Sequence, residues 1–274
     1  MPRTAAGHPL QDIADQLFRA EAARVPIEPL TSRYPGLSVA DAYRIQQLNV
    51  ARRQAAGERV NGHKIGLTAR AMQIKFNVDE PDYGHLLDTM TVAPGAVLDM
   101  AELIDPQIEV EPAFMLGKPL AGPGVTLDDV MAATEYVCVC FEVIDSRIAD
   151  WRIRLEDTVA DNGSSARLVL GTERHDPVGL DLYDMLTELE VDGTIVERGS
   201  TGAILGHPAN GIAWLANALA SFDVVLEAGH VVLPGTCTPS RRIAGCGEVR
   251  GRIEGLGEVR LELAGAPYVS RPAN

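Results

Sequence analysis

The feature that most constrains the fold is a change in sequence pattern near Asn61. Beyond this residue the chain consists of short apolar runs, rich in β-branched residues and separated by Gly and Pro. Runs of this kind indicate strands joined by turns. Two short links, Asp192-Gly193 and the residues 254–257, predict tight hairpins. The runs predict ten strands, at 63–66, 97–99, 107–116, 137–144, 166–170, 189–191, 194–198, 230–233, 248–254 and 258–263.

Before Asn61 the pattern is helical. Apolar residues recur at helical spacing over 10–25, and a second helix is expected from Ser38, where Asp41 completes a capping box, to about Ala56. Further helices are predicted at 127–135 (with Thr126 as N-cap), 182–188 and 208–221. Because strands cluster rather than alternate with helices, the pattern favours the α+β class. We expect two parts, an N-terminal helical arm over 1–60 and a β-rich catalytic domain over 61–274.

Composition excludes several classes of protein. The 274 residues carry 38 acidic and 24 basic side chains, a formal charge of −14, which disfavours binding to phosphate backbones. No apolar run is long enough to span a membrane, and Asp12 and Asp15 interrupt any signal-peptide pattern near the start. The four cysteines lack zinc-finger spacing, and Cys138 and Cys140 alternate on one face of a predicted strand. We therefore expect reduced, packing cysteines and a cytoplasmic location.

Three glutamates form the sharpest local signal. Glu109 and Glu111 lie two residues apart in an apolar strand, so their side chains point to the same face. Glu142 lies in a second apolar run. Neighbouring buried carboxylates repel unless a cation lies between them, and a hard ion such as Mg²⁺ takes such oxygen ligands. The alternative is a solvated strand edge, which the Glu-x-Glu pattern by itself favours. The apolar flanks and the third acid in a similar setting make the two interpretations about even.

Other segments carry further candidates. Lys64 lies in a short strand between glycines and could transfer protons if its pKa is shifted, although a surface lysine is the simpler interpretation. Thr68 is predicted to cap a short helix whose start could bind a carboxylate. The loop-like run 79–86 offers Asp82 or His85, and the turn 161–165 offers Ser164, each with an ordinary turn as the alternative. His63 is expected to pack on the face opposite Lys64.

Taken in order, these segments resemble the 2-keto-4-pentenoate hydratase and 4-oxalocrotonate decarboxylase group of the fumarylacetoacetate hydrolase superfamily. The resemblance covers about residues 9–265 and depends on the order of its motifs. These are KIGLT at 64–68, EPDYGHL at 80–86, EVE at 109–111 with AF at 113–114, EVIDSR at 142–147, DTVADN at 157–162, SS at 164–165, LGHPAN at 205–210, EAGH at 227–230, LPG at 233–235 and GLG at 255–257.

The resemblance implies a mixed β-sandwich-like roll in which Glu109, Glu111 and Glu142 bind Mg²⁺ (or Mn²⁺). It implies a lyase of aromatic meta-cleavage catabolism that hydrates 2-hydroxypenta-2,4-dienoate (2-keto-4-pentenoate) to 4-hydroxy-2-oxopentanoate. The alternative on the same scaffold is decarboxylation of 4-oxalocrotonate (2-oxo-3-hexenedioate). Residues 148–153, 209–217 and 230–236 look like the hydratase branch, whereas Ala166-Arg167 leans toward the decarboxylase. A third interpretation is a non-catalytic partner subunit.

Within that resemblance, Lys64 and Asp82 are the candidates for proton transfer, and Thr68 and Ser164 for binding the substrate carboxylate. A homo-oligomer and a complex with a cognate decarboxylase are expected, with no nucleic-acid or membrane partner. Three positions depart from the family pattern: His63, Gly163 and Pro112. Because Pro112 has no N–H group, we expect a strand edge or bulge there.

Overall fold

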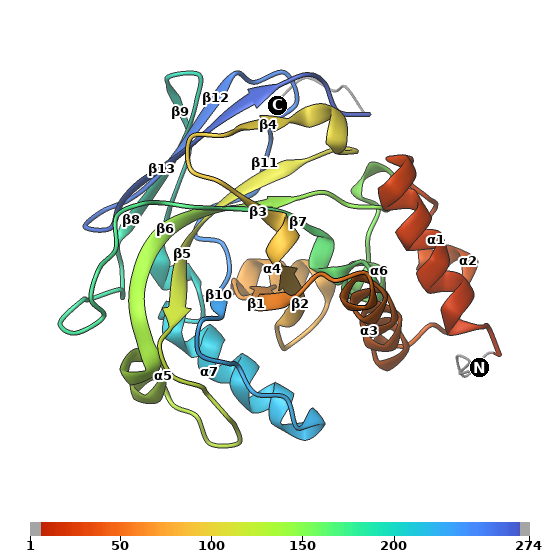
Figure 1. The fold of residues 1–274 in the computed structure, drawn as a ribbon, viewed down its shortest axis with the longest axis horizontal. Coiled ribbons are helices and arrows are strands. Elements are labelled where there is room, and N and C mark those ends of the chain that lie inside the picture. Colours follow the sequence, from red (N-terminus) through yellow and green to blue (C-terminus); the bar gives the residue numbers. More distant parts are fainter. Residues whose placement is uncertain (1–6, 269–274) are drawn as a thin grey trace.

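The computed structural model describes residues 7–268, except for the side chains of residues 71, 75 and 76. Two sheets form the body of the molecule (Figure 1). The larger sheet has the order β2-β1-β10-β5-β6-β7-β3, with β11 also paired to β5, and the smaller has the order β4-β13-β12-β8-β9. The strands are β1 Val60–Gly66, β2 Asp82–Leu87, β3 Thr91–Val92, β4 Val97–Asp99, β5 Gln107–Leu116, β6 Thr134–Ile144, β7 Ser165–Leu170, β8 Leu186–Val191, β9 Thr194–Ser200, β10 Val231–Leu233, β11 Arg241–Arg242, β12 Glu248–Ile253 and β13 Gly257–Ala264.

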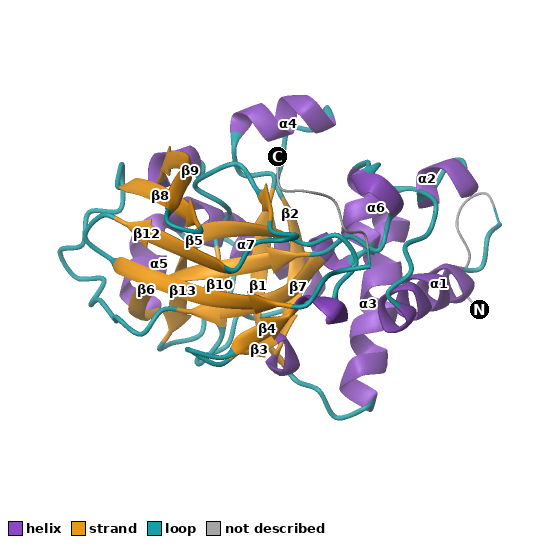
Figure 2. Ribbon diagram, turned by 90° about the horizontal axis from the view of Figure 1, so that it is seen from above, coloured by secondary structure: helices purple, strands orange, loops and turns teal. Residues whose placement is uncertain are grey.

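Among the described residues, seven α-helices flank the sheets. Four of them, α1, α2, α3 and α6, lie together at one side of the strands, while α4 stands apart from that group (Figure 2). Their bounds are α1 Leu10–Ala23, α2 Leu30–Arg33, α3 Val39–Ala55, α4 Arg70–Phe76, α5 Leu127–Ala133, α6 Leu155–Ala160 and α7 Pro208–Leu219. In the part of the chain that the structure describes, no helix is both long and apolar enough to cross a membrane. The fold belongs to the α+β class, as predicted.

The two faces of β5 serve different environments. Ile108, Val110 and Phe114 are fully buried in the main core, which includes residues of the smaller sheet. The alternate residues face the inside of the curled larger sheet, where Ala113 packs in a second apolar cluster with Cys138 and Cys140. Period-two alternation therefore directs Glu109 and Glu111 into the interior of the roll.

The N-terminal helices have a core of their own. Ile13, Leu30 and Ile45 pack there with Val159 and Ala160, which belong to α6 in the β-rich half of the chain. The predicted capping box is present: the Ser38 side chain accepts from the Asp41 backbone, and Asp41 accepts in return. The arm is thus fastened to the rest of the molecule by apolar packing on α6.

Two sequence predictions of local structure are wrong. In the expected helix at 182–188, residues 182–185 form neither helix nor strand, and Leu186 begins β8, which pairs with β9 through the predicted Asp192-Gly193 turn and with β12 on its other side. Pairing on both sides overrides the helical spacing of this segment. Much of the run 79–86, interpreted as a loop, is strand β2. Its Gly84 lies where a Cβ would come within 2.4 Å of the Asn162 carbonyl oxygen, so this glycine permits a close approach rather than a turn.

Pro112 lies at neither the expected strand edge nor a bulge, but in a gap of strand pairing on one side of the interior strand β5. Strand β5 pairs with β6 along its length, but on its other side β10 pairs with Phe114 and Met115, and β11 pairs with Gln107 and Ile108. Pro112 falls between these two partner strands. Its lack of an N–H group is therefore compatible with a position inside an otherwise paired strand.

Candidate metal-binding and catalytic site

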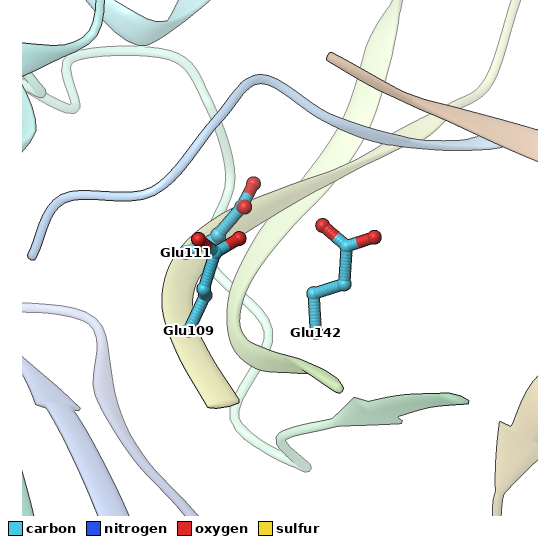
Figure 3. A group of neighbouring side chains, drawn as sticks. All are labelled: Glu109, Glu111 and Glu142. Atoms are coloured by element: carbon cyan, nitrogen blue, oxygen red, sulfur yellow. The ribbon is translucent and has the colours of Figure 1, made fainter. Parts of the chain in front are cut away.

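Three glutamates meet inside the roll. Glu109 and Glu111 come from β5, and Glu142 comes from β6 directly opposite Glu109 in the antiparallel register. Figure 3 shows the three carboxylates directed into one shared space. Each offers an oxygen that lies within 4.8 Å of the others. The predicted convergence of these side chains is thus observed.

The electrostatics of this cluster fit a cation. Glu111 and Glu142 are buried, with exposures of 1% and 0%, and Glu109 is half-buried. Burial, followed by repulsion from Glu142, raises the pKa of Glu109 to about 7 and that of Glu111 well above its usual value. Gly235 N–H donates to Glu111 Oε2 at 2.9 Å, but neither carboxylate oxygen of Glu142 has a hydrogen-bond partner among the described residues. Orphaned buried carboxylate oxygens in a set of three are the donors that a hard divalent ion takes.

Lys64 brings one positive charge to the cluster. It lies on β1, is 5% exposed, and its Nζ is 3.5 Å from Glu142 Oε2. Burial by itself lowers the pKa of Lys64, but Glu142, Asp82 and the other two glutamates together raise it above its usual value. The side chain is therefore a protonated ammonium that faces carboxylates.

Asp82 lies beside this lysine. It is the first residue of β2 and pairs with Gly66 on β1, two residues beyond Lys64, so both side chains occupy the same face. The carboxyl group is 2% exposed, and burial raises its pKa despite the opposing effect of Lys64. His85, the alternative from the same run, points the other way and its ring lies 4.9 Å from that of His63. His63 is buried on the face opposite Lys64, as predicted.

A cavity of about 240 Å³ opens from this cluster. Its polar wall includes Glu109, Lys64 and Asp82, together with both predicted substrate contacts, Thr68 and Ser164. Its remaining lining residues are Ile65, Gly66, Leu67, Ala69, Met72, Gln107, Ile144, Trp151, Ile153, Thr158, Gly163, Thr236 and Ser240. One space therefore joins all the predicted proton-transfer and carboxylate-binding groups.

The expected helix cap at Thr68 is wrong. Helix α4 has Ala69 as its N-cap, and no side chain caps it. Thr68 is instead buried at the cavity wall, packed against the backbone of Gly235. The chain after β10 thus approaches Thr68 and also donates to Glu111, so long-range packing decides the position of this hydroxyl.

A left-handed turn forms the opposite wall. Asn162, Gly163 and Ser164 all have positive φ, between 55° and 61°. A Cβ on Gly163 would lie 3.1 Å from Lys64 Cδ, so glycine leaves room for the lysine. Ser164 directs both its N–H and its hydroxyl to Asp161.

Buried charge holds this turn in place. Arg147, 5% exposed, donates from Nε and from its backbone N–H to the Asp161 carboxylate, and from Nη2 to the Asp161 carbonyl. Asn162 exchanges two hydrogen bonds with the His85 backbone at 2.8 and 2.9 Å. These contacts offset the cost of left-handed backbone at residues other than glycine.

Sequence reasoning did not identify the apolar part of the cavity. Trp151, Ile153 and Met72 line it, yet Trp151 and Ile153 lie in an irregular segment without periodicity, and Met72 is an exposed residue of α4. No local pattern marks such residues, because their shared wall exists only when the segment after β6 and helix α4 come together in the folded chain.

Comparison with known proteins agrees with this fold. Residues 61–264 match the family profile described as fumarylacetoacetate (FAA) hydrolase C-terminal. The chain is 45% identical over 226 residues to 2-hydroxyhexa-2,4-dienoate hydratase of Comamonas testosteroni, covering 82% of this chain and 86% of the relative. It is 46% identical over 216 residues to 2-hydroxypent-2,4-dienoate hydratase of Pseudomonas putida, covering 78% and 97%.

A solved structure gives a similar result. 4-Oxalocrotonate decarboxylase from Pseudomonas putida G7, complexed with magnesium and adipate, superposes with a TM-score of 0.88. The identity is 35%, and the match covers 96% of this chain and 100% of that one. At this identity and coverage the likeness extends beyond the β-rich part to the N-terminal helices.

Proposed function

This chain belongs to the fumarylacetoacetate hydrolase family, and from that membership we propose that it is a metal-dependent hydro-lyase. Its reaction is the hydration of 2-hydroxypenta-2,4-dienoate (2-keto-4-pentenoate) to 4-hydroxy-2-oxopentanoate, a step of aromatic meta-cleavage catabolism. The names of two relatives above 40% identity support a dienoate hydratase. The observation that carries the proposal is the meeting of three buried glutamates beside a cavity that holds Lys64 and Asp82.

We assign Glu109, Glu111 and Glu142 as ligands of one divalent ion, Mg²⁺ with Mn²⁺ as the alternative. The magnesium in the related decarboxylase structure and the all-carboxylate donor set both support a hard ion. When bound, such an ion supplies Lewis acidity to the 2-oxo oxygen and the carboxylate of an α-keto acid.

Lys64 and Asp82 are assigned to proton transfer. The dienol must lose its O–H proton and gain one at C5, and water must then add at C4 while C3 gains a proton. A protonated Lys64 is suited to hold negative charge that develops on the enol oxygen and to donate a proton. Asp82 is suited to accept a proton from water, and Lys64 opposes the burial that otherwise disfavours its carboxylate.

Thr68 is our first candidate for contact with the substrate carboxylate, because its buried hydroxyl lies at the cavity wall. Ser164 is the second candidate. Its hydroxyl would contact substrate only after turning away from Asp161, to which it now donates at 3.2 Å.

The decarboxylase remains the alternative, since the related solved structure has that activity by name. Release of CO₂ from 2-oxo-3-hexenedioate without hydration of the pentadienoate would select it. A homo-oligomer, a complex with a cognate decarboxylase and a cytoplasmic location stay predictions from the family resemblance. Sedimentation of the purified chain, alone and with a decarboxylase relative, tests the first two.

The ligand assignment predicts a specific loss in Glu109→Gln. Removing one of three carboxylate ligands should lower kcat by more than about 100-fold, weaken magnesium binding in calorimetry and leave the circular dichroism spectrum unchanged. Glu135→Gln is the matched control, because Glu135 is exposed on the same strand as Glu142. Near-normal kcat in Glu109→Gln, or full activity of the wild type after chelation, would contradict the assignment.

A further inference from the structure

We infer that this site selects substrates whose distal end is uncharged and apolar, with Trp151 as the residue that sets this preference. The inference rests on the proposed function for the orientation of the substrate, whose 2-oxo acid end lies at the glutamates. It goes further by excluding a second carboxylate at the other end. That exclusion would also disfavour the decarboxylase alternative, whose substrate is a diacid.

Exposure orders the cavity from its inner end to its opening. Most of the charged groups and hydroxyls at the inner end are deeply buried: Asp82 and Ser164 are each 2% exposed, Thr68 is 4% exposed and Lys64 is 5% exposed, whereas Glu109 is half-buried. Met72 is 37% exposed, and Trp151 and Ile153 are half-buried. A chain held at its 2-oxo acid end by the buried groups therefore extends toward Met72, Trp151 and Ile153.

The charge of the lining does not suit a second anion. Among the described side chains that line the cavity, Lys64 is the one cation, and it already faces Glu142 at 3.5 Å. On nearby α4, Arg70 donates to Gln73 Oε1 at 3.2 Å. A carboxylate moved from water into this cavity without a cation loses its hydration with little compensation.

Two half-buried hydroxyls of the lining, those of Thr236 and Ser240, are engaged elsewhere. Thr236 donates its hydroxyl proton to the Thr238 carbonyl at 2.7 Å, and Ser240 donates to Gln107 Oε1 at 2.7 Å. Their protons are therefore directed into the protein. A distal carboxylate would have to displace these bonds in order to accept a hydrogen bond from either hydroxyl, whereas an alkyl group leaves them intact.

Trp151 is held in place although its backbone is strained. Asp150 and Trp151 are consecutive residues with positive φ, 60° and 55°. The indole Nε1–H donates to the Asp105 carbonyl at 2.9 Å, and the segment just before it is bridged to Ile27 of the helical arm. Backbone strain of this kind persists where surrounding contacts fix it, and here it presents a rigid aromatic face to the cavity.

The first test compares two matched ligands on the magnesium-loaded protein by calorimetry. 2-Oxohexanoate and 2-oxoadipate have six-carbon chains that differ in a terminal methyl group or carboxylate. We expect 2-oxohexanoate to bind more than about tenfold tighter, a difference set by desolvation of the second carboxylate. Equal affinities, tighter binding of 2-oxoadipate, or no binding of either ligand would overturn the inference.

The second test adds a cation to the cavity wall. Met72→Arg should shift the affinity ratio at least about tenfold toward 2-oxoadipate, because its guanidinium can pair with the distal carboxylate. Ile74→Arg is the matched control: Ile74 is 66% exposed on the same helix and is not among the lining residues. The same shift in both variants would show a general effect of charge and contradict a specific subsite.

The third test concerns Trp151 itself. Trp151→Ala should weaken the binding of 2-oxohexanoate by about tenfold. The affinity for pyruvate, which is too short to reach the indole, should change by no more than about twofold. Trp151→Phe should restore most of the affinity. Equal weakening of both ligands in both variants would indicate only a structural role and would count against the assignment.

These measurements separate the inference from the proposed function. If the protein prefers 2-oxohexanoate but does not hydrate 2-hydroxypenta-2,4-dienoate, the inference stands and the hydratase assignment is wrong. If it hydrates the pentadienoate and a diacid homologue with equal kcat/KM, the hydratase assignment stands and the inference is wrong.

Discussion

Neighbouring residues on β1 face opposite environments. Lys64 lies among carboxylates inside the roll, whereas His63 packs against His85 and His230 on the other face, with ring centroids 4.9 and 5.9 Å away. Burial, followed by the two other imidazoles, lowers the pKa of His63 well below its usual value. One strand therefore holds a charged lysine and a neutral histidine side by side in sequence.

This histidine cluster predicts loss of stability in acid. Burial lowers the pKa of His85 from 6.5 to about 4, and the pKa of His230 is also lowered by burial. Between these pH values the unfolded chain binds protons that the folded chain excludes, so the free energy of unfolding falls as pH falls from about 6.5 to 4.

Replacing His85 tests that linkage. The contribution of His85 is on the order of 2 kcal/mol, and His85→Gln should reduce the loss of stability between pH 7 and pH 5 in urea denaturation. An unchanged pH dependence in the variant would show that other groups control acid stability.

At the scale of elements, the turn 162–164 depends on a buried ion pair. Arg147 and Asp161 have side-chain exposures of 5% and 1%. They support the turn that forms one wall of the cavity. Burial raises the pKa of Asp161 to about 6, although the positive charge of Arg147 opposes this rise. Arg147 therefore stabilises the ionised form of the buried carboxylate. Losing one member of such a pair leaves a buried charge uncompensated.

Arg147→Lys should therefore affect both stability and activity. Three nitrogens of Arg147 reach the Asp161 carboxylate and the carbonyls of Asp145 and Asp161, and the single nitrogen of a lysine cannot occupy all three positions. We therefore expect the free energy of unfolding to fall by about 3 kcal/mol and kcat/KM to fall by about tenfold as Ser164 shifts. Arg152→Lys is the control, because Arg152 is half-exposed and pairs with Glu28 at the surface. Equal effects in the two variants would contradict the special role of Arg147.

At the scale of the whole molecule, the helical arm and the β-rich part share contacts that limit independent unfolding. Gln46 of α3 donates to the carbonyls of Tyr83 on β2 and Val159 on α6. Thr31 donates from its N–H and hydroxyl to Asp157. The expected division into an arm over 1–60 and a catalytic domain over 61–274 stays a prediction, but these bonds couple the two parts.

That coupling predicts a single unfolding transition. Ile45→Ala removes a fully buried side chain from the arm cluster and should lower the free energy of unfolding by about 2 to 5 kcal/mol. Arm and sheet signals should still change together, with far-ultraviolet circular dichroism coinciding with the fluorescence of the two tryptophans, Trp151 and Trp214. Arg44→Ala, on the exposed side of the same helix, should change stability by less than about 1 kcal/mol. Two separated transitions would instead show an autonomous arm.

The sequence by itself determined the features that depend on near neighbours. Alternation directed Glu109 and Glu111 to one face, the Ser38 capping box and the Thr126 N-cap began two helices, and Asp192-Gly193 closed a hairpin. These signals are local, because the spacing of side chains along a strand or at a helix start is set by backbone geometry alone.

Only the tertiary structure decided which distant segments meet. The register of β5 with β6 placed Glu142 opposite Glu109, pairing on two sides made a strand of β8, and the packing of the segment after β6, with its indole bound to Asp105, brought Trp151 to the cavity. Register, sheet curl and the meeting of loops depend on the packing of the whole core, so no short window of sequence contains them.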